Sequence, residues 1–291
     1  MKGQARSSAA ITIVNALPTG VGCAVGIDLH AEARVTVTPT TSEGPPSFEI
    51  PAEARTPVVE ESLRYGANRY LAQSGFTARL ELRSEIPVAR GLKSSSAVST
   101  AILLACARAA GRVPTALEVG RMAAEAGRQS GASATGALDD ALSGLDPGFV
   151  VTDNGRGELN RRAPVDAAWG VVLYVPPRPH PPSPNLIAAF SAEAAEGRRA
   201  AEAARDGDWL TAMRLNTELV ERVMAYPYER LRDRLRSHGA LASGVSGLGP
   251  ALATIAPMDR LPEVMRALPD DEAARFAVPF TQRSAMEASA P

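Results

Sequence analysis

The sequence contains few residues of the kinds that form disulfides, bind zinc or supply a catalytic histidine. Only two cysteines occur among the 291 residues, Cys23 and Cys106, and each lies in an apolar stretch far from the other. The three histidines, His30, His180 and His238, are equally scattered. This usage excludes a disulfide framework and argues against a zinc site or a Ser-His-Asp triad. It fits a reducing compartment, the cytoplasm.

Charge of one sign and long hydrophobic runs are also lacking. The chain has 31 Lys and Arg against 32 Asp and Glu, which argues against a nucleic-acid partner or an anionic membrane surface. No run approaches the ~18 apolar residues that a membrane span needs, and residues 1–6 lead into polar Ser7 and Ser8. Because 45% of the residues are hydrophobic, we expect a soluble globular protein with a real core and a small-molecule partner. Its oligomeric state is not readable from these features.

The order of the expected elements indicates an α+β protein. Alternating or β-branched apolar residues predict strands at residues 10–17, 23–38, 47–50, 77–84, 149–152, 170–175 and 275–279. Residues 239–255 are expected to form a loop and a strand. Apolar residues at helical spacing predict helices at residues 58–74, 94–110, 114–127, 137–142, 187–205, 208–224, 231–238 and 261–268. Strands and helices do not alternate regularly and no internal repeat is visible, which favours α+β over a parallel α/β fold.

We place a domain boundary near residues 161–168, before the apolar strand predicted at 170–175. This boundary predicts an N-terminal domain of residues 1–163 and a C-terminal domain of residues 164–291. Soon after this point the chain carries the proline-rich run 176–184. Proline fixes φ and removes amide donors, so this run predicts an extended surface loop.

One segment combines features of an anion-binding loop. A predicted strand is followed by the loop 87–93 and by a helix that opens with Ser94, Ser95 and Ser96. Gly91 lets the backbone approach a ligand closely, and the amides and dipole of a helix N-terminus favour a phosphate. The segment is neither a Walker A motif nor Gly-x-Gly-x-x-Gly. A serine-rich helix start is also typical of an ordinary capped helix, so both interpretations stay open at this point.

The pattern Pro87-x-x-x-Gly91-Leu92-x-Ser94-Ser95-Ser96-Ala97 resembles the central motif of the GHMP kinases, usually Pro-x-x-x-Gly-Leu-Gly-Ser-Ser-Ala-Ala. Lys93 stands in place of the second glycine and Ser96 in place of an alanine. Both departures resemble the archaeal-type shikimate kinases, whose loop reads Gly-Leu-Lys-Ser-Ser-Ser-Ala.

Three further segments agree with this resemblance in the same order along the chain. Residues 244–250, Gly-Val-Ser-Gly-Leu-Gly-Pro, resemble the third GHMP motif, although alone they would read as a tight turn. Residues 15–29 resemble the substrate-side opening of the same shikimate kinases, and residues 151–154 also match. The resemblance therefore covers nearly the whole chain.

The resemblance implies the two-domain GHMP kinase fold: an N-terminal mixed β/α domain with the phosphate loop and a C-terminal ferredoxin-like α+β domain. It implies a phosphotransferase with an alcohol acceptor that uses ATP and Mg²⁺ to convert shikimate to 3-phosphoshikimate, a step of aromatic amino acid biosynthesis. Two alternatives remain: a GHMP kinase for another cyclic polyol or hydroxy acid of secondary metabolism, and a non-catalytic small-molecule binder on the same fold.

The candidate catalytic carboxylate follows a glycine-containing turn at residues 131–136. Galactokinase and mevalonate kinase carry an Asp after a comparable turn, and this resemblance assigns that place to Asp139, as base or as orienter of the acceptor hydroxyl. The alternative is a structural role, in which Asp139 and Asp140 cap or flank a short helix. Two adjacent carboxylates would suit Mg²⁺, whereas the resemblance assigns the metal to a hydroxyl of the serine loop, so Asp140 and Ser95 are both candidate metal ligands.

The remaining candidates are assigned by the same resemblance. Lys93 is a candidate catalytic residue that neutralises charge on ATP, with a solvated lysine as the alternative. No motif selects a cation for a substrate carboxylate among Arg34, Arg90 and Arg178. The residues expected to hold the ATP phosphates are Pro87, Ala89, Arg90, Gly91, Leu92, Lys93, Ser94, Ser95, Ser96 and Ala97. Those expected to bind the substrate are Asn15, Thr19, Gly20, Asp28, Asp139, Ser246 and Gly247.

Overall fold

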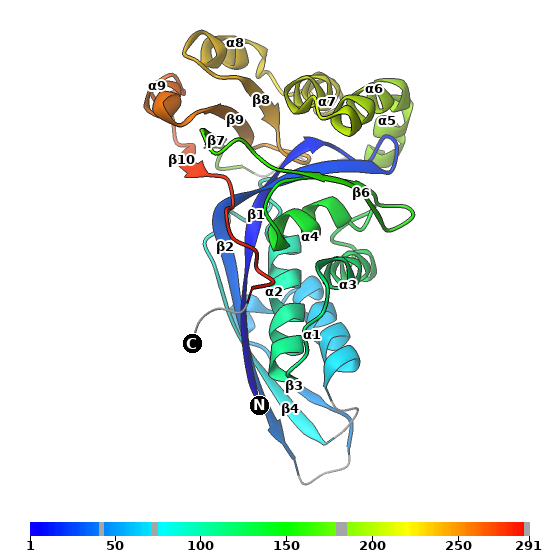
Figure 1. Cartoon of the computed structure of the whole chain (residues 1–291). Helices are drawn as coiled ribbons and strands as arrows, with labels where there is room; N and C mark the ends of the chain where they lie inside the picture. Colours follow the sequence, from blue (N-terminus) through cyan, green and yellow to red (C-terminus); the bar gives the residue numbers. More distant parts are fainter. Residues whose placement is uncertain (41–43, 72–74, 179–184, 288–291) are drawn as a thin grey trace.

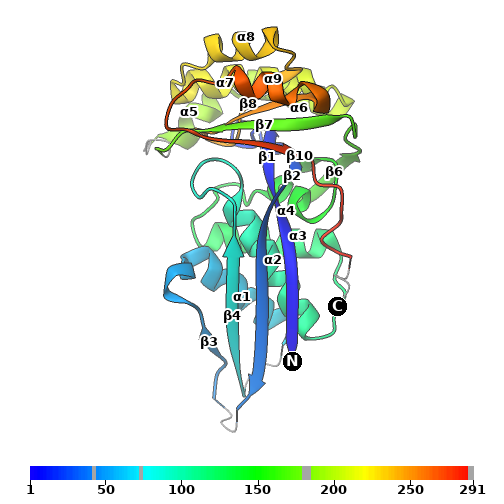
Figure 2. The same ribbon diagram turned by 90° about the vertical axis from the view of Figure 1, so that its left-hand side faces the viewer.

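A long twisted sheet with helices on one face carries a second, smaller α+β unit at one of its ends (Figures 1 and 2). The computed structural model describes residues 1–40, 44–71, 75–178 and 185–287. The N-terminus lies at the end of the sheet away from the second unit (Figure 2). The part of the predicted proline-rich loop at 179–184 falls outside the described residues.

Strand β2 is the centre of the six-stranded sheet. It pairs antiparallel with β1 along one edge, and along the other edge with β5 near its start and β4 near its end. In the second half of β2 the burial alternates as predicted, with Ala33, Val35 and Val37 buried and Arg34 exposed. The strands are β1 (Lys2–Val14), β2 (Val21–Pro39), β3 (Ser47–Glu49), β4 (Phe76–Ser84), β5 (Phe149–Asp153) and β6 (Glu158–Ala163).

Four helices cover one face of this sheet: α1 (Pro57–Tyr70), α2 (Ser94–Ala109), α3 (Ala116–Gln129) and α4 (Leu138–Leu145). Helix α2 is almost wholly buried between the sheet and its neighbours, which its many small residues allow. At one close approach, a Cβ on Gly66 of α1 would lie 2.8 Å from the Cys106 sulfur of α2. Cys106 and the equally buried Cys23 are therefore core residues.

The second unit has a four-stranded antiparallel sheet in the order β10-β7-β9-β8. Its strands are β7 (Trp169–Val175), β8 (Ala242–Val245), β9 (Leu252–Pro257) and β10 (Ala274–Pro279). Its helices are α5 (Leu186–Ala192), α6 (Ala194–Asp206), α7 (Trp209–Met224), α8 (Glu229–Ser237) and α9 (Leu261–Arg266). Two short 3₁₀ turns, Ala52–Ala54 and Met258–Arg260, complete the regular elements of the described chain.

The two units share strand β1. Residues 2–7 of β1 alternate between exposed and buried, whereas residues 8–14 are all buried because α6 and α7 also pack on this end. The polar start of β1 hid it from the sequence analysis, which placed the strand at residues 10–17.

Three other expectations differ from the structure. The single helix predicted over residues 187–205 is two helices, since the chain leaves helical geometry at Glu193, with ψ at 19°. Strand β6 was not predicted because its sequence is mostly polar and charged and lies exposed at the sheet edge. After β10 the chain returns to the first unit, where Thr281 N donates to Gly26 O at 2.9 Å and Ala285 N to Leu145 O at 2.7 Å. The boundary between residues 163 and 164 stays a prediction. None of the helices among the described residues has both the length and the apolarity for a membrane span.

Candidate active site

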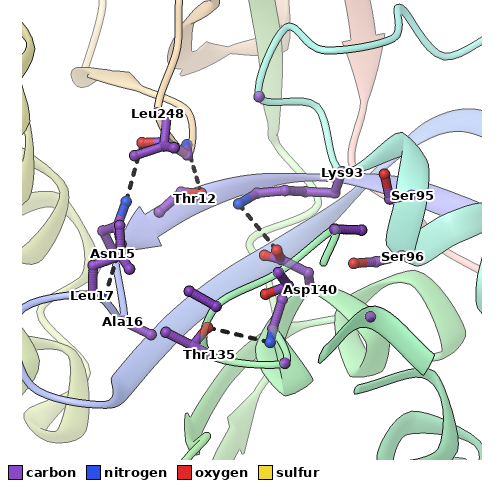
Figure 3. Close-up of a pocket in the computed structure, with 18 of the residues that line it drawn as sticks. Thr12, Asn15, Ala16, Leu17, Lys93, Ser95, Ser96, Thr135, Asp140 and Leu248 are labelled. Carbon is purple, nitrogen blue, oxygen red and sulfur yellow. Dashed lines mark hydrogen bonds and ion pairs between the residues drawn. The ribbon is translucent and has the colours of Figure 1, made fainter. Parts of the chain in front are cut away.

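A cavity of about 810 Å³ opens where the two units meet. It is walled by the end of β1, the serine loop before α2, the loop before α4, the start of α5 and the glycine loop after β8. Figure 3 shows residues from the end of β1, the serine loop, the loop before α4 and the glycine loop converging on one space. Its size is that of a small-molecule site.

The serine loop presents a free helix N-terminus to this cavity. Helix α2 begins at Ser94, and its first backbone amides have no partner within the helix, as at any helix start. Its N-cap Lys93 makes no side-chain cap, and the hydroxyls of Ser94, Ser95 and Ser96 make no hydrogen bond with any other described residue. Amides, hydroxyls and helix dipole together form a cradle for an anion such as a phosphate.

Gly91 is required by the contact between the two glycine-containing loops. Its φ is +86°, and a Cβ there would overlap the Ser246 carbonyl, lying 2.9 Å from the carbonyl carbon. The Ser246 hydroxyl donates to Gly91 O at 2.7 Å, and Ala251 N donates to Arg90 O at 3.1 Å. The predicted phosphate loop and the predicted third motif therefore form one continuous wall.

The end of β1 supports this wall from below. Gly247 N donates to the Thr12 hydroxyl at 2.8 Å, and Thr12 N donates to the Ser246 hydroxyl at 3.1 Å. The Asn15 side chain donates to Gly247 O at 3.2 Å (Figure 3). Asn15 N donates to the side-chain Oδ1 of Asn216 at 2.7 Å. Asn15 thus lines the cavity with its amide already committed to the loop.

Asp139 lies in the first turn of α4 and is 4% exposed. Its Oδ1 accepts a hydrogen bond of 2.9 Å from Asn154 Nδ2. Burial first, and then the nearby Asp140, raise the pKa of Asp139 to about 7, against the opposing effects of Lys93 and Asn154. Gly22 of β2 makes room for the carboxylate, since a Cβ there would lie 2.5 Å from Asp139 Cγ. The result is a carboxylate able to change its protonation near neutral pH.

Asp140 faces the phosphate loop and pairs with it. Its Oδ2 lies 3.1 Å from Lys93 Nζ, and the two side chains point at one another across the cavity floor (Figure 3). Lys93 reaches this position from a left-handed backbone, φ +64°, which ordinarily favours glycine. Burial raises the pKa of Asp140 and Lys93 opposes the rise. The Oδ1 atom of Asp140 is buried and has no partner among the described residues, so it could accept a further donor or a cation.

Several predicted residues lie elsewhere. Asp28 is not at the cavity: its carboxylate pairs with His30 Nε2 at 3.1 Å on an exposed part of β2. Arg90 is turned away, because its guanidinium donates to Pro176 O at 3.0 Å and to Pro177 O. The structure therefore does not bring these two predicted residues into the lining of the cavity.

Four more predicted residues do not line the cavity. Ala97 is buried inside α2, and Thr19 packs beside Gly197 of α6 in the turn that Gly20 closes with φ +80°. Ser246 is fully buried and acts on the loops rather than on a ligand. The predicted residues that do line the cavity are Asn15, Pro87, Ala89, Gly91, Leu92, Lys93, Ser94, Ser95, Ser96, Asp139, Asp140 and Gly247.

Some residues that line the cavity were not predicted from the sequence. Thr12 was read as one residue of an apolar strand, although a polar residue in such a run is a signal for a buried hydrogen bond. Thr135, which lies inside the glycine-containing turn 131–136, and the start of α5, residues 186–188, also line the cavity, but none of these residues was a predicted site residue. Among the described residues no cluster of three His, Cys, Asp or Glu side chains could hold a metal ion.

Comparisons with known proteins agree with this architecture. The profiles "GHMP kinases N terminal domain" and "GHMP kinases C terminal" match residues 59–145 and 199–274. The chain is 34% identical over 281 residues to the shikimate kinase of Pyrococcus furiosus, covering 93% of this chain and 97% of that protein. It is 35% identical over 268 residues to the shikimate kinase of Halobacterium salinarum, covering 91% and 92%.

A solved structure, "Phosphotransferase related to CoA biosynthesis pathway", is similar with a TM-score of 0.76 at 18% identity, covering 98% of this chain and 97% of that one. At this identity the likeness speaks for the fold alone. The predicted family, the two-domain α+β fold and the phosphotransferase class are confirmed, and use of ATP follows from them. The chain belongs to the GHMP kinase family.

Proposed function

We propose that this protein transfers the γ-phosphoryl group of ATP to the 3-hydroxyl of shikimate in the cytoplasm. The observation that carries the proposal is one cavity lined both by the buried carboxylate of Asp139 and by a helix N-terminus whose three serine hydroxyls have no hydrogen-bond partner among the described residues. Phosphoryl transfer needs an anion cradle and a positioned acceptor hydroxyl, and this cavity offers groups for both. The choice of shikimate as acceptor is supported by the two archaeal relatives named above.

In the proposed reaction the acceptor hydroxyl oxygen attacks the γ-phosphorus. A new P–O bond forms, the bond from the γ-phosphorus to the β,γ-bridging oxygen breaks, and ADP leaves with that electron pair. The hydroxyl proton passes to Asp139, whose raised pKa suits a base that works near neutral pH.

The phosphates would lie on the amides and hydroxyls of Ser94, Ser95 and Ser96. Lys93 would offset their negative charge from the floor of the cavity. Mg²⁺ would be held by Asp140, whose Oδ1 has no partner among the described residues, and by Ser95, and would neutralise phosphate charge. Asn15 and Gly247, which line the same cavity, would contact the acceptor.

A related acceptor class is the second candidate, a cyclic polyol without a carboxylate. Among the described residues that line the cavity, Lys93 is the only cationic side chain, and it is already paired with Asp140. A substrate carboxylate would therefore compete for that lysine or rely on backbone amides.

The test is ADP release on incubation with ATP, Mg²⁺ and shikimate, repeated with a panel of cyclic polyols and hydroxy acids. We expect turnover of shikimate, and a fall of about 10²-fold or more for Asp139→Ala, the range in which positioned bases act. Turnover of another polyol alone would contradict the shikimate assignment. No ADP above background with any acceptor would point to a non-catalytic binder.

A further inference from the structure

Asn154 occupies a buried junction beside the candidate catalytic carboxylate. It directly follows β5, it is 3% exposed, and its backbone N donates to Gly20 O at 2.8 Å just before β2. Its side chain does not line the cavity. Any effect on the reaction must therefore pass through a neighbour.

Three hydrogen bonds determine the orientation of the Asn154 amide. Its Nδ2 donates to Asp139 Oδ1 at 2.9 Å and, more weakly, to the Thr135 hydroxyl at 3.4 Å. Its Oδ1 accepts from the Thr152 hydroxyl at 2.7 Å. Because a carboxylate only accepts hydrogen bonds, the NH₂ end of the Asn154 amide must face Asp139. The Thr152 hydroxyl donates to the amide oxygen and so stabilises this orientation.

Asp139 is thus held from two sides. Gly22 leaves just enough room for the carboxylate against β2, with its own missing Cβ 2.8 Å from Asp139 Oδ1. Asn154 binds that same oxygen, so rotation of the carboxylate is opposed by a steric wall and by a hydrogen bond. In a buried site neither restraint is replaced by water.

We propose that Asn154 is a positioning residue that aims the Asp139 carboxylate at the acceptor hydroxyl, with Thr152 fixing the Asn154 amide. This inference rests on the proposed role of Asp139. The plainer reading is that Asn154 only ties β5 to the loop before α4 through Thr135. The two readings differ in whether the effect of Asn154 depends on the Asp139 carboxylate.

The experiment is a double-mutant cycle with Asn154→Leu and Asp139→Asn, in which kcat and KM are measured by steady-state transfer from radiolabelled ATP. We expect Asn154→Leu to lower kcat by about 100-fold with KM for ATP within about threefold, as for a reacting group misplaced by ~1 Å. In the Asp139→Asn background the same change should cost less than about twofold, because there is no carboxylate left to aim.

Two further variants make the cycle specific. Asn154→Asp has the same shape as asparagine and keeps the hydrogen bond from Thr152, but it loses the NH₂ donor to Asp139. It should therefore lower kcat as Asn154→Leu does. It also keeps the proposal testable if Asn154→Leu folds poorly. Thr254→Val removes a buried hydroxyl that donates to Ser243 Oγ at 3.0 Å in the other sheet, and it should leave kcat unchanged.

Several outcomes would overturn the proposal. The first is a kcat within twofold of wild type for both Asn154 variants. The second is the same fractional loss of kcat on Asn154→Leu in the presence and absence of the Asp139 carboxylate. The third is an effect confined to KM for ATP. A wild-type protein without turnover would instead contradict the proposed function. In that case crystal structures decide the present question: an Asp139 carboxylate that keeps its orientation in Asn154→Leu and Asn154→Asp would refute positioning.

Discussion

Replacing Gly22 by alanine should displace the Asp139 carboxylate and little else. The three atoms nearest to a Cβ at Gly22 all belong to the Asp139 carboxylate, including Cγ at 2.5 Å. Gly22 is not among the residues with positive φ, so the backbone accepts alanine without strain. The perturbation therefore acts on one functional group from a residue that does not itself line the cavity.

The size of the effect follows from the distance. Ordinary carbon contacts are about 3.5 Å or longer, so the carboxylate must move by about 1 Å. A misplacement of about 1 Å in a reacting group costs on the order of 10²-fold, or about 2.7 kcal/mol of transition-state stabilisation. We expect kcat/KM for the acceptor to fall by about 100-fold in Gly22→Ala. Overpacking should cost a further 1–3 kcal/mol of folding stability, roughly.

The assay is steady-state ADP release, with thermal melting to show that the variant is folded at the assay temperature. Gly155→Ala is the matched control: its Cβ would meet only Asp153 Oδ1, at 3.4 Å, and its activity should equal that of the wild type. A folded Gly22→Ala protein with kcat/KM within threefold of wild type would refute the role given to Asp139.

Four more predictions concern the loops and the carboxylate. Ser95→Ala should weaken ATP binding in calorimetry with little change in Tm of the ligand-free protein, because this hydroxyl caps nothing; a large loss of Tm with unchanged affinity would support a structural role. Ser246→Ala should lower the free energy of unfolding by about 1–3 kcal/mol in denaturant titrations, since Gly91 O and Thr12 N both lose a buried partner; unchanged stability would contradict that link. The raised pKa of Asp139 predicts that kcat/KM falls as the pH drops through about 7. Protonated Asp139 stabilises the fold fully below its unfolded pKa, and this contribution is lost progressively as the pH rises through about 7. Asp139→Asn should therefore melt higher than wild type at pH 8 and by a smaller margin at pH 5; equal Tm values at pH 8 would contradict the shift.

Much of the site was predictable because its pieces are local. The segment around Gly91 and Ser94, a strand followed by a glycine loop and a helix, predicts an anion site. It does so because backbone conformation and helix polarity depend on neighbours in the chain. The start of α4 at Leu138 and the carboxylates in its first turn were similarly within reach. The position of Asp28 outside the cavity could not be predicted, because a nearby motif does not show which way the side chains of a strand face.

Local sequence therefore determined the family, most of the helices and strands, and the residues of the two loops. Tertiary structure alone decided that Gly91 touches Ser246, that Lys93 meets Asp140, and that Asn154 aims at Asp139. The first of these pairs is 155 residues apart in the chain, so its distance depends on how sheet and helices pack. The raised pKa of Asp139 has the same origin, because burial and a nearby charge are properties of the assembled fold and not of a motif.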